Sequence, residues 1–261
     1  MFKSILFAVY DFTFKAVSAA LFGILLLLAF AITAPMGHES YFGLYRYDYL
    51  LLFSISIQAL LIYFKLETWH EAKVIALFHF LGFVMELYLT HPAIGSWQYP
   101  QPATLKLWTV PLFAGFMYSA VGSFFARALR LYQVSFEQLP SFRNMLALSV
   151  LSYLNFMTKF FVPDIRYGLF VWSVLIFYKT KVSVQVGVYH LKFPMLLILM
   201  LLALIIWIAE NISTFYQIWL YPTQVEQWHR VGYAKMGSWY LLLMLSLVLV
   251  MKVLRTFEKR K

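Results

Sequence analysis

Long apolar runs constrain this chain more than any other feature of its sequence. Eight runs bounded by charges, proline or glycine lie at residues 16–35, 47–64, 72–89, 108–126, 143–161, 163–178, 193–216 and 235–252. A helix needs about 20 mostly apolar residues to cross a bilayer core. With 62% hydrophobic and 12% charged residues, the 261-residue chain has no room for a sizeable soluble domain. The sequence predicts an all-α polytopic membrane bundle in which residues 1–261 form a single integral-membrane domain.

The N-terminal segment differs from these runs. Residues 1–15 mix apolar side chains with Lys3, Asp11 and Lys15, which is typical of a helix lying at the membrane interface. The apolar stretch 16–35 is longer than the core of a cleaved signal peptide. We therefore expect an interfacial helix followed by a first span that stays in the protein.

The distribution of lysine and arginine decides between seven and eight spans, because the sixth run is short. With eight spans, fifteen of the 21 basic residues share one side with the N-terminus. The six on the other side are Arg46, Lys106, Lys159, Arg166, Arg230 and Lys235. Basic residues concentrate on the cytoplasmic side, so the bias predicts a protein of the bacterial cytoplasmic (inner) membrane with both termini in the cytoplasm. The net charge of +10 is then a topology signal, and no nucleic-acid partner is expected.

Two segments four spans apart repeat the same order of residues. Glu86 precedes Trp97-Gln98-Tyr99-Pro100, and Glu210 precedes Trp219-Leu220-Tyr221-Pro222. A lysine and a tryptophan follow in each case, Lys106 with Trp108 and Lys235 with Trp239. Interfacial belts explain part of the aromatic content, but they do not explain the paired glutamates. The pattern predicts a parallel 4+4 repeat with halves over 16–140 and 141–261.

Polar side chains in the runs reach a common depth. Counting about 1.5 Å per residue from the cytoplasmic end of each run places Glu86, Glu210, Lys159, Asp164, Arg166 and Lys235 in the outer third of the core. Asn155 falls just short of this level. Ionisable groups inside a membrane usually face a bundle interior or an aqueous cavity. The sequence thus predicts a polar cavity open to the outer leaflet.

The alternative interpretation is an ion-pair network that only joins the two halves, with Lys106, Lys159, Arg166 and Lys235 neutralising the acids. We expect His79 to be a hydrogen-bonded core histidine and not a binding residue. His91 and His229 are freer to bind a ligand. No His-Glu-x-x-His, glycine-rich phosphate loop or cysteine is present, and only three aspartates occur. No metal and no cofactor are expected.

Four stretches carry a resemblance to a known family: MELYLTHPAIGSWQYP, VPLFAGFMYSAVGSF, LNFMTKFFVPDIRYG and IIWIAENISTFYQIWLYP. Together they resemble, over about residues 70 to 252, the uncharacterised bacterial integral-membrane family filed as domain-of-unknown-function family 817. That resemblance implies a multi-span inner-membrane protein and no particular activity. More weakly, Glu86 followed by Gly95-Ser-Trp-Gln-Tyr99 and Pro111-Leu112 is similar to membrane carotenoid cyclases and hydratases.

The sequence leaves three functions open. In the first, Glu86 and Glu210 act as general acid and base on an isoprenoid or other lipid ligand taken from the bilayer. In the second, the same glutamates carry protons in a small-solute transporter. In the third, the chain is an accessory or structural subunit. The oligomeric state is not predicted. The expected binding residues are His79, His91, Trp97, Tyr99, Lys106, Trp108, Asn155, Lys159, Asp164, Arg166, Asn211, Trp219, Tyr221, His229, Lys235 and Trp239.

Overall fold

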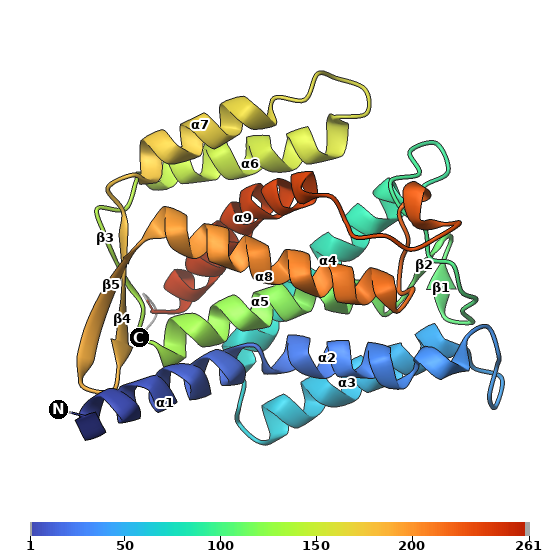
Figure 1. The fold of residues 1–261 in the computed structure, drawn as a ribbon, viewed down its shortest axis with the longest axis horizontal. Coiled ribbons are helices and arrows are strands. Elements are labelled where there is room, and N and C mark those ends of the chain that lie inside the picture. The colour runs from blue at the N-terminus through green and yellow to red at the C-terminus, as the bar shows by residue number, and fades with distance from the viewer. Residues whose placement is uncertain (1, 259–261) are drawn as a thin grey trace. The chain divides into compact units, whose positions relative to one another are not determined.

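The fold comes from a computed structural model that describes residues 2–258 (Figure 1). The chain is mostly helical. Its helices are α1 (Phe2–Ala19), α2 (Leu21–Ile32), α3 (Arg46–Tyr63), α4 (Trp69–Leu89), α5 (Ala114–Leu131), α6 (Phe142–Thr158), α7 (Arg166–Phe177), α8 (Met195–Phe215) and α9 (Tyr233–Glu258). Lys259, Arg260 and Lys261, which belong to the fifteen basic residues expected on the cytoplasmic side, lie outside the described residues.

Each predicted apolar run overlaps a helix, but the helices differ in length. In the described part of the chain, α4, α8 and α9 are long and apolar enough to cross a membrane. A fourth crossing results if α1 and α2 together form one broken span. The break lies at Ala20, several residues after the expected end of the interfacial segment. The twelve residues of α7 rise only about 18 Å.

The chain divides into two compact units, which are described separately. The first consists of Met1–Ala20, Phe124–Trp207 and Gly232–Lys261. In this unit α6 packs against α7 and α9, and Figure 1 shows α6 and α7 running side by side. Ser173 of α7 and Tyr240 of α9 share a hydrogen bond of 3.0 Å between their hydroxyls.

A three-stranded antiparallel sheet in the first unit was not part of the all-α expectation. Its strands, in the order β3-β4-β5, are β3 (Ser135–Glu137), β4 (Lys181–Val186) and β5 (Tyr189–Pro194). Valines alternate with polar residues along β4, which is a strand pattern. Gly187, with a φ of 54°, allows the tight turn into β5. The sheet holds the α5–α6 and α7–α8 connections at one end of this unit.

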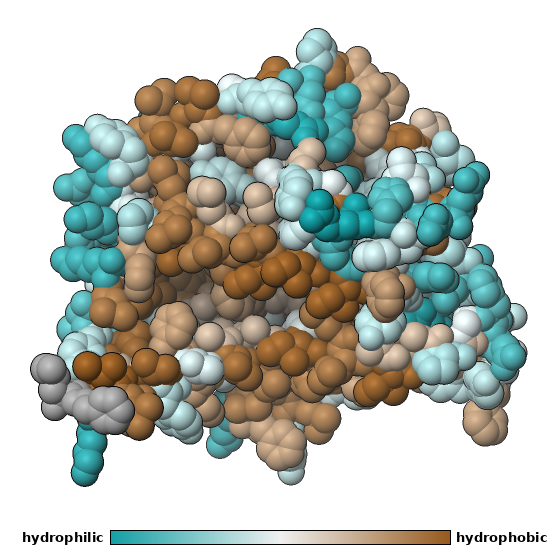
Figure 2. All heavy atoms as spheres, in the orientation of Figure 1, coloured by the Kyte–Doolittle hydropathy of each residue, from teal (hydrophilic) through white to brown (hydrophobic). Residues whose placement is uncertain are grey.

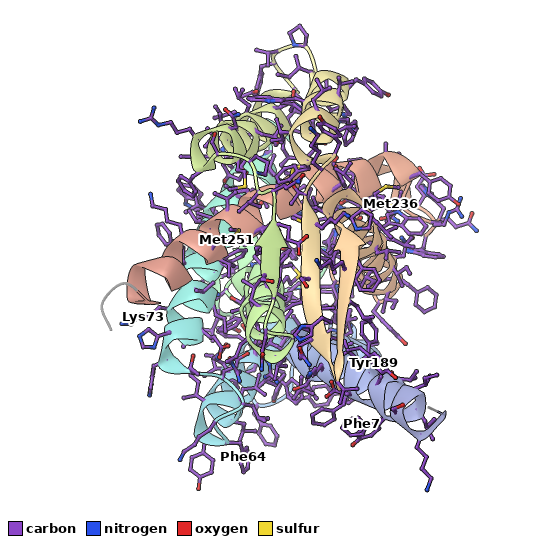
Figure 3. All side chains as sticks on the ribbon, turned by 90° about the vertical axis from the view of Figure 1, so that its left-hand side faces the viewer. Phe7, Phe64, Lys73, Tyr189, Met236 and Met251 are labelled. Atoms are coloured by element: carbon purple, nitrogen blue, oxygen red, sulfur yellow. The ribbon has the colours of Figure 1, made fainter. Side chains whose placement is uncertain are left out.

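The helix α1 is fastened to the same sheet by polar contacts. The Asp11 carboxylate accepts a hydrogen bond from the Gly187 amide at 2.7 Å, and Lys15 Nζ donates to the Gln185 carbonyl at 3.0 Å. Figure 3 shows Phe7 of α1 close to Tyr189 of β5. The N-terminal helix and both of these connections therefore lie together.

The second unit consists of Leu21–Ser123 and Ile208–Val231. It contains α2, α3, α4, the first part of α5, the last part of α8, and a short hairpin of β1 (Lys106–Leu107) and β2 (Val110–Pro111). Thr68 caps α4 by accepting a hydrogen bond from the Glu71 amide, while Glu71 accepts one from the Thr68 amide. The hydrophobic core is built around Phe22, Phe30, Tyr47, Phe113 and Ile218.

A buried arginine joins several loops of the second unit. Arg46, with 1% of its surface exposed, donates to the Thr33 hydroxyl, the Gln101 side-chain oxygen, and the carbonyls of Phe30 and Tyr216. Phe30 lies in the last turn of α2, and Tyr216 directly follows α8. The C-terminal ends of helices carry partial negative charge, so these carbonyls stabilise the guanidinium without a carboxylate.

A buried aspartate two residues later fixes the loop that precedes the β1–β2 hairpin. The Asp48 carboxylate accepts hydrogen bonds from the amides of Tyr45, Thr104 and Leu105, at 2.9, 2.9 and 2.7 Å. Together, Arg46 and Asp48 hold the loops after α2, α4 and α8 at the same end of the second unit.

Hydrophobic side chains also cover outer faces of the helices. In Figure 2 they gather along α8. The exposed side chains of α8 include Leu197, Met200, Leu201, Ile205 and Ile208. Such a surface is unfavourable in water and suits contact with lipid.

Candidate functional site

Glu86 on α4 is held in a cage of aromatic donors. The carboxylate is almost completely buried, with 2% of the residue exposed. Its Oε2 accepts a hydrogen bond from Trp97 Nε1 at 2.7 Å, and its Oε1 accepts one from the Tyr118 hydroxyl at 2.7 Å. Among the described residues no lysine or arginine contacts it. The ion-pair interpretation of the sequence therefore does not describe Glu86.

A glycine makes room for this arrangement. Gly82 precedes Glu86 by one helical turn, and a Cβ atom built on Gly82 would lie 2.3 Å from ring atoms of Tyr118. Any larger side chain would push the tyrosine away. The close approach of α4 and α5 at this point thus places the Tyr118 hydroxyl on Glu86.

Glu210 on α8 has a corresponding partner. It is 3% exposed, and its Oε1 accepts a hydrogen bond of 2.5 Å from the Tyr221 hydroxyl. Each glutamate thus accepts a hydrogen bond from an aromatic residue of the Trp-x-Tyr-Pro segment that follows it in the sequence.

The two Trp-x-Tyr-Pro segments, residues 97–100 and 219–222, meet in the second unit. Gln98 and Leu220 form an antiparallel bridge in which each amide donates to the carbonyl of the other at 2.9 Å. Both residues hold the same place in their segment, between Trp and Tyr. A reciprocal antiparallel pair is related by a local two-fold axis. The ring centroids of Trp97 and Tyr221 lie 6.2 Å apart in an edge-on contact.

We refer to Glu86, Glu210, Trp97, Tyr99, Tyr118 and Tyr221 as the carboxylate–tyrosine cluster. The members of the cluster interact electrostatically: the Tyr118 hydroxyl lies within range of the charges of both Glu86 and Glu210. Burial, followed by the Glu86 charge, raises the pKa of Tyr99 well above 10.0. Burial, followed by the Glu210 charge, does the same to the pKa of Tyr221. Both loop tyrosines are therefore protonated donors at neutral pH.

The geometry determines what the cluster can do chemically. Ionised carboxylates are acceptors only, and protonated phenols can donate or accept. The hydrogen-bond donors that contact Glu86 among the described residues are neutral. Because no positive charge compensates the ionised carboxylate, its burial away from water is energetically unfavourable. The cluster is suited to taking up and releasing protons.

A second group of predicted residues comes together in the first unit. Asn155 Nδ2 donates to Asp164 Oδ1 at 2.9 Å, and Arg166 forms an ion pair of 2.5 Å with Asp164. Partial burial by itself raises the pKa of Asp164, but the hydrogen bonds from Arg166 and Asn155 outweigh it and lower the value from 3.8 to about 2. Asp164 and Arg166 thus form a local ion pair, and because both lie in the predicted half 141–261, this pair does not join the two halves.

The predicted histidines do not join the cluster. His79 packs on Phe83 and Phe116, and its buried Nδ1 has no hydrogen-bond partner in the described residues, unlike the expectation for a core histidine. His91 accepts a hydrogen bond from the Ala93 amide. The ring nitrogens of His229 contact the carbonyls of Thr223 and Arg230. The described residues contain no group of three or more potential metal ligands.

The remaining predicted residues are distributed over both units. Lys106 and Trp108 are exposed at the β1–β2 hairpin. Lys235 and Trp239 lie on α9 and belong to the first unit. Asn211 accepts a hydrogen bond of 2.9 Å from the Val231 amide and thereby fixes the end of the second unit.

Sequence reasoning missed Tyr118, Arg46 and Asp48. Tyr118 had one usable signal, the small residue Gly82 one turn from the glutamate. Arg46 was counted only as a basic residue on the outer side of the membrane, and Asp48 received no role. Nothing in their spacing indicates that their partners are backbone groups of distant loops.

The comparisons with known proteins agree with the sequence resemblance. The family described as "Protein of unknown function (DUF817)" matches residues 8–247. The chain is 38% identical over 214 residues to "Uncharacterized protein YoaT" of Bacillus subtilis (strain 168), covering 82% of this chain and 80% of that protein. No solved structure matches, and nothing in these comparisons supports the weaker similarity to carotenoid cyclases. The chain belongs to the DUF817 family.

Proposed function

We propose that this chain is a multi-pass protein of the bacterial inner membrane with eight spans and both termini in the cytoplasm. The sheet supports this topology, because it gathers α1 and the two connections rich in lysine and arginine at one end of the first unit. The loops after α2, α4 and α8 gather at one end of the second unit. In this proposal the short helix α7 crosses with help from flanking residues or local thinning of the bilayer.

The proposal includes a parallel repeat with halves over 16–140 and 141–261 in a single membrane domain. It is supported by the antiparallel bridge between Gln98 and Leu220, which hold equivalent positions in the two copies. A local two-fold axis along the membrane normal is what two parallel repeats would produce.

Within this framework, the function that the geometry supports best is proton-coupled transport of a small solute. The observation that carries it is the pair of buried carboxylates, each on a helix long enough to span and each bound by a phenol. Buried ionisable groups inside a membrane commonly mark proton relays. In this mechanism the glutamates bind protons when the site faces the more acidic side and release them after the site reopens.

An enzyme acting on an isoprenoid or other lipid is the second candidate. The aromatic rings around the glutamates, including the contact between Trp97 and Tyr221, could stabilise a positive charge on a substrate. Both oxygens of Glu86 are already bound by Trp97 and Tyr118, so a substrate would have to displace one of them. This favours transport over direct acid–base catalysis.

The experiment uses proteoliposomes with an imposed pH gradient and an internal pH-sensitive dye. Pools of small amino acids, organic acids and amines are added outside, and the rate of gradient collapse is recorded. We expect at least one pool to accelerate collapse in the wild type. Glu86→Gln and Glu210→Gln should abolish the acceleration, whereas Glu39→Gln, at an exposed loop position, should retain it.

Two results would redirect the proposal. Collapse that is indifferent to both cluster variants would exclude proton coupling through these glutamates. A lipid species present in extracts of expressing cells, and lost with Glu86→Gln, would favour the enzyme.

A further inference from the structure

A small polar hollow lies in the first unit, and none of the residues assigned to proton handling lines it. It is formed by α6, the start of α7 and α9. Leu241 and Leu242 form an apolar wall, and the polar lining comes from Ser152, Asn155, Lys159, Arg166 and Ser238. The space inside is about 10 Å³, which admits one atom the size of a water oxygen.

The charge balance of the hollow is positive. The Lys159 ammonium lies over the rings of Phe156 and Phe160, at 4.6 and 5.3 Å from their centroids. No hydrogen bond or ion pair to it is found among the described residues. Asp164 is already paired with Arg166. Two cations therefore share one carboxylate, and one positive charge is left without a counter-ion.

A buried hydroxyl points to a missing ligand. Ser152 is 2% exposed and lines the hollow, yet its Oγ has no hydrogen-bond partner in the part of the chain that the structure describes. Buried polar groups are rarely left unpaired. A hydroxyl donor beside an uncompensated cation is a combination that binds an anionic oxygen.

The size of the hollow limits what can enter. Only one oxygen atom fits, so the rest of the anionic group must remain at the mouth. A phosphate or carboxylate group meets this condition, because one of its oxygens can insert while the others face outward. An intact solute such as a sugar or an amino acid does not fit inside.

The surroundings of the mouth favour a lipid over a free ion. The α6–α7 loop exposes Phe160, Phe161, Val162 and Ile165, and Tyr167 follows at the start of α7. Exposed aromatic and aliphatic side chains beside a lysine and an arginine are typical of the interface at which phospholipid headgroups lie.

We propose that this hollow binds the phosphate group of a membrane phospholipid, with one phosphate oxygen held by Lys159, Arg166 and the Ser152 hydroxyl. The site is independent of proton transfer at Glu86 and Glu210. Its occupant would join α6, α7 and α9 at the membrane interface and stabilise the first unit.

Thermal unfolding of the full-length protein in dodecyl maltoside micelles tests the proposal. Dioleoylphosphatidylglycerol, dioleoylglycerol without a phosphate, and inorganic phosphate are added separately. The phospholipid should raise the Tm, whereas dioleoylglycerol and inorganic phosphate should not. Lys159→Met should lose more than half of the rise, and Lys159→Arg should keep it.

Lys181→Met is the matched control, because Lys181 lies on β4 at the far end of α7 and is exposed. It should keep the full rise in Tm. An equal rise with dioleoylglycerol would show that the phosphate is not recognised. A full rise with inorganic phosphate alone would assign the site to a free anion, and an unchanged rise in Lys159→Met would overturn the site altogether.

Discussion

Replacing Glu86 by glutamine and by alanine separates a positioning role from a proton-carrying role. Trp97 Nε1 can only donate a hydrogen bond, whereas the Tyr118 hydroxyl can donate or accept. In Glu86→Gln the amide oxygen can accept from Trp97, and the amide NH₂ can donate to Tyr118 after its hydroxyl turns. Both hydrogen bonds of the cage are then retained.

The two substitutions should differ strongly in stability. Glu86→Ala removes the carboxylate that accepts the hydrogen bonds from Trp97 and Tyr118, at about 1–3 kcal/mol for each bond lost. The free energy of unfolding should fall by about 2–6 kcal/mol in Glu86→Ala and by about 1 kcal/mol or less in Glu86→Gln. Proton coupling should be lost in both.

Unfolding by sodium dodecyl sulfate in mixed micelles, followed by tryptophan fluorescence, measures these differences. Adding Tyr118→Phe to Glu86→Gln should cost more than adding it to Glu86→Ala, because only the amide NH₂ needs the phenol oxygen. Equal destabilisation by glutamine and alanine would refute the proposed cage. It would also favour the accessory-subunit interpretation, in which the ionised carboxylate serves the fold alone.

Three further predictions follow from local geometry. Gly82→Ala should destabilise by about 1–3 kcal/mol because its Cβ would collide with Tyr118, whereas Gly168→Ala, with open space around it, should stabilise by about 0.4–1 kcal/mol in the same unfolding assay. Gln98→Pro removes the amide that donates to the buried Leu220 carbonyl and should cost about 1–3 kcal/mol, while Gln98→Ala should have little effect. The pKa of Asp164, lowered from 3.8 to about 2, means that its ionised form stabilises the fold above pH 3.8 and that this stability is lost as the pH falls toward 2. Unfolding of Asp164→Asn across that range should show a smaller pH dependence, and an unchanged one would contradict the ion pair.

The positions of the helices could be predicted because apolar runs of the required length report them directly. The glutamates and their Trp-x-Tyr-Pro segments could be singled out for a related reason, since charged residues inside such runs are rare. Glu86 is bound by Trp97 and Glu210 by Tyr221, because the loop after each helix folds back onto the helix that carries the glutamate. The bridge between Gln98 and Leu220 brings together residues 122 positions apart, and no local pattern encodes it.

The sheet, the role of Arg46 and the break between α1 and α2 could not be predicted from the sequence. The alternation in β4 lies in a connection that was interpreted through its lysines, so the strand was missed. The partners of Arg46 are mostly backbone carbonyls, which every residue carries, and sequence cannot distinguish the two that matter. The break at Ala20 lies far from Pro35, the nearest proline, so the residues around it do not predict a break.

Charge movement in response to pH tests the central claim most directly, because it needs no knowledge of the solute. Proteoliposomes adsorbed on a solid-supported membrane are exposed to a rapid acidification, and the transient current from proton binding inside the protein is recorded. We predict a transient in the wild type and in Glu39→Gln that disappears in the double variant Glu86→Gln, Glu210→Gln. An undiminished transient in the double variant would contradict the assignment of the buried glutamates as the proton-binding groups.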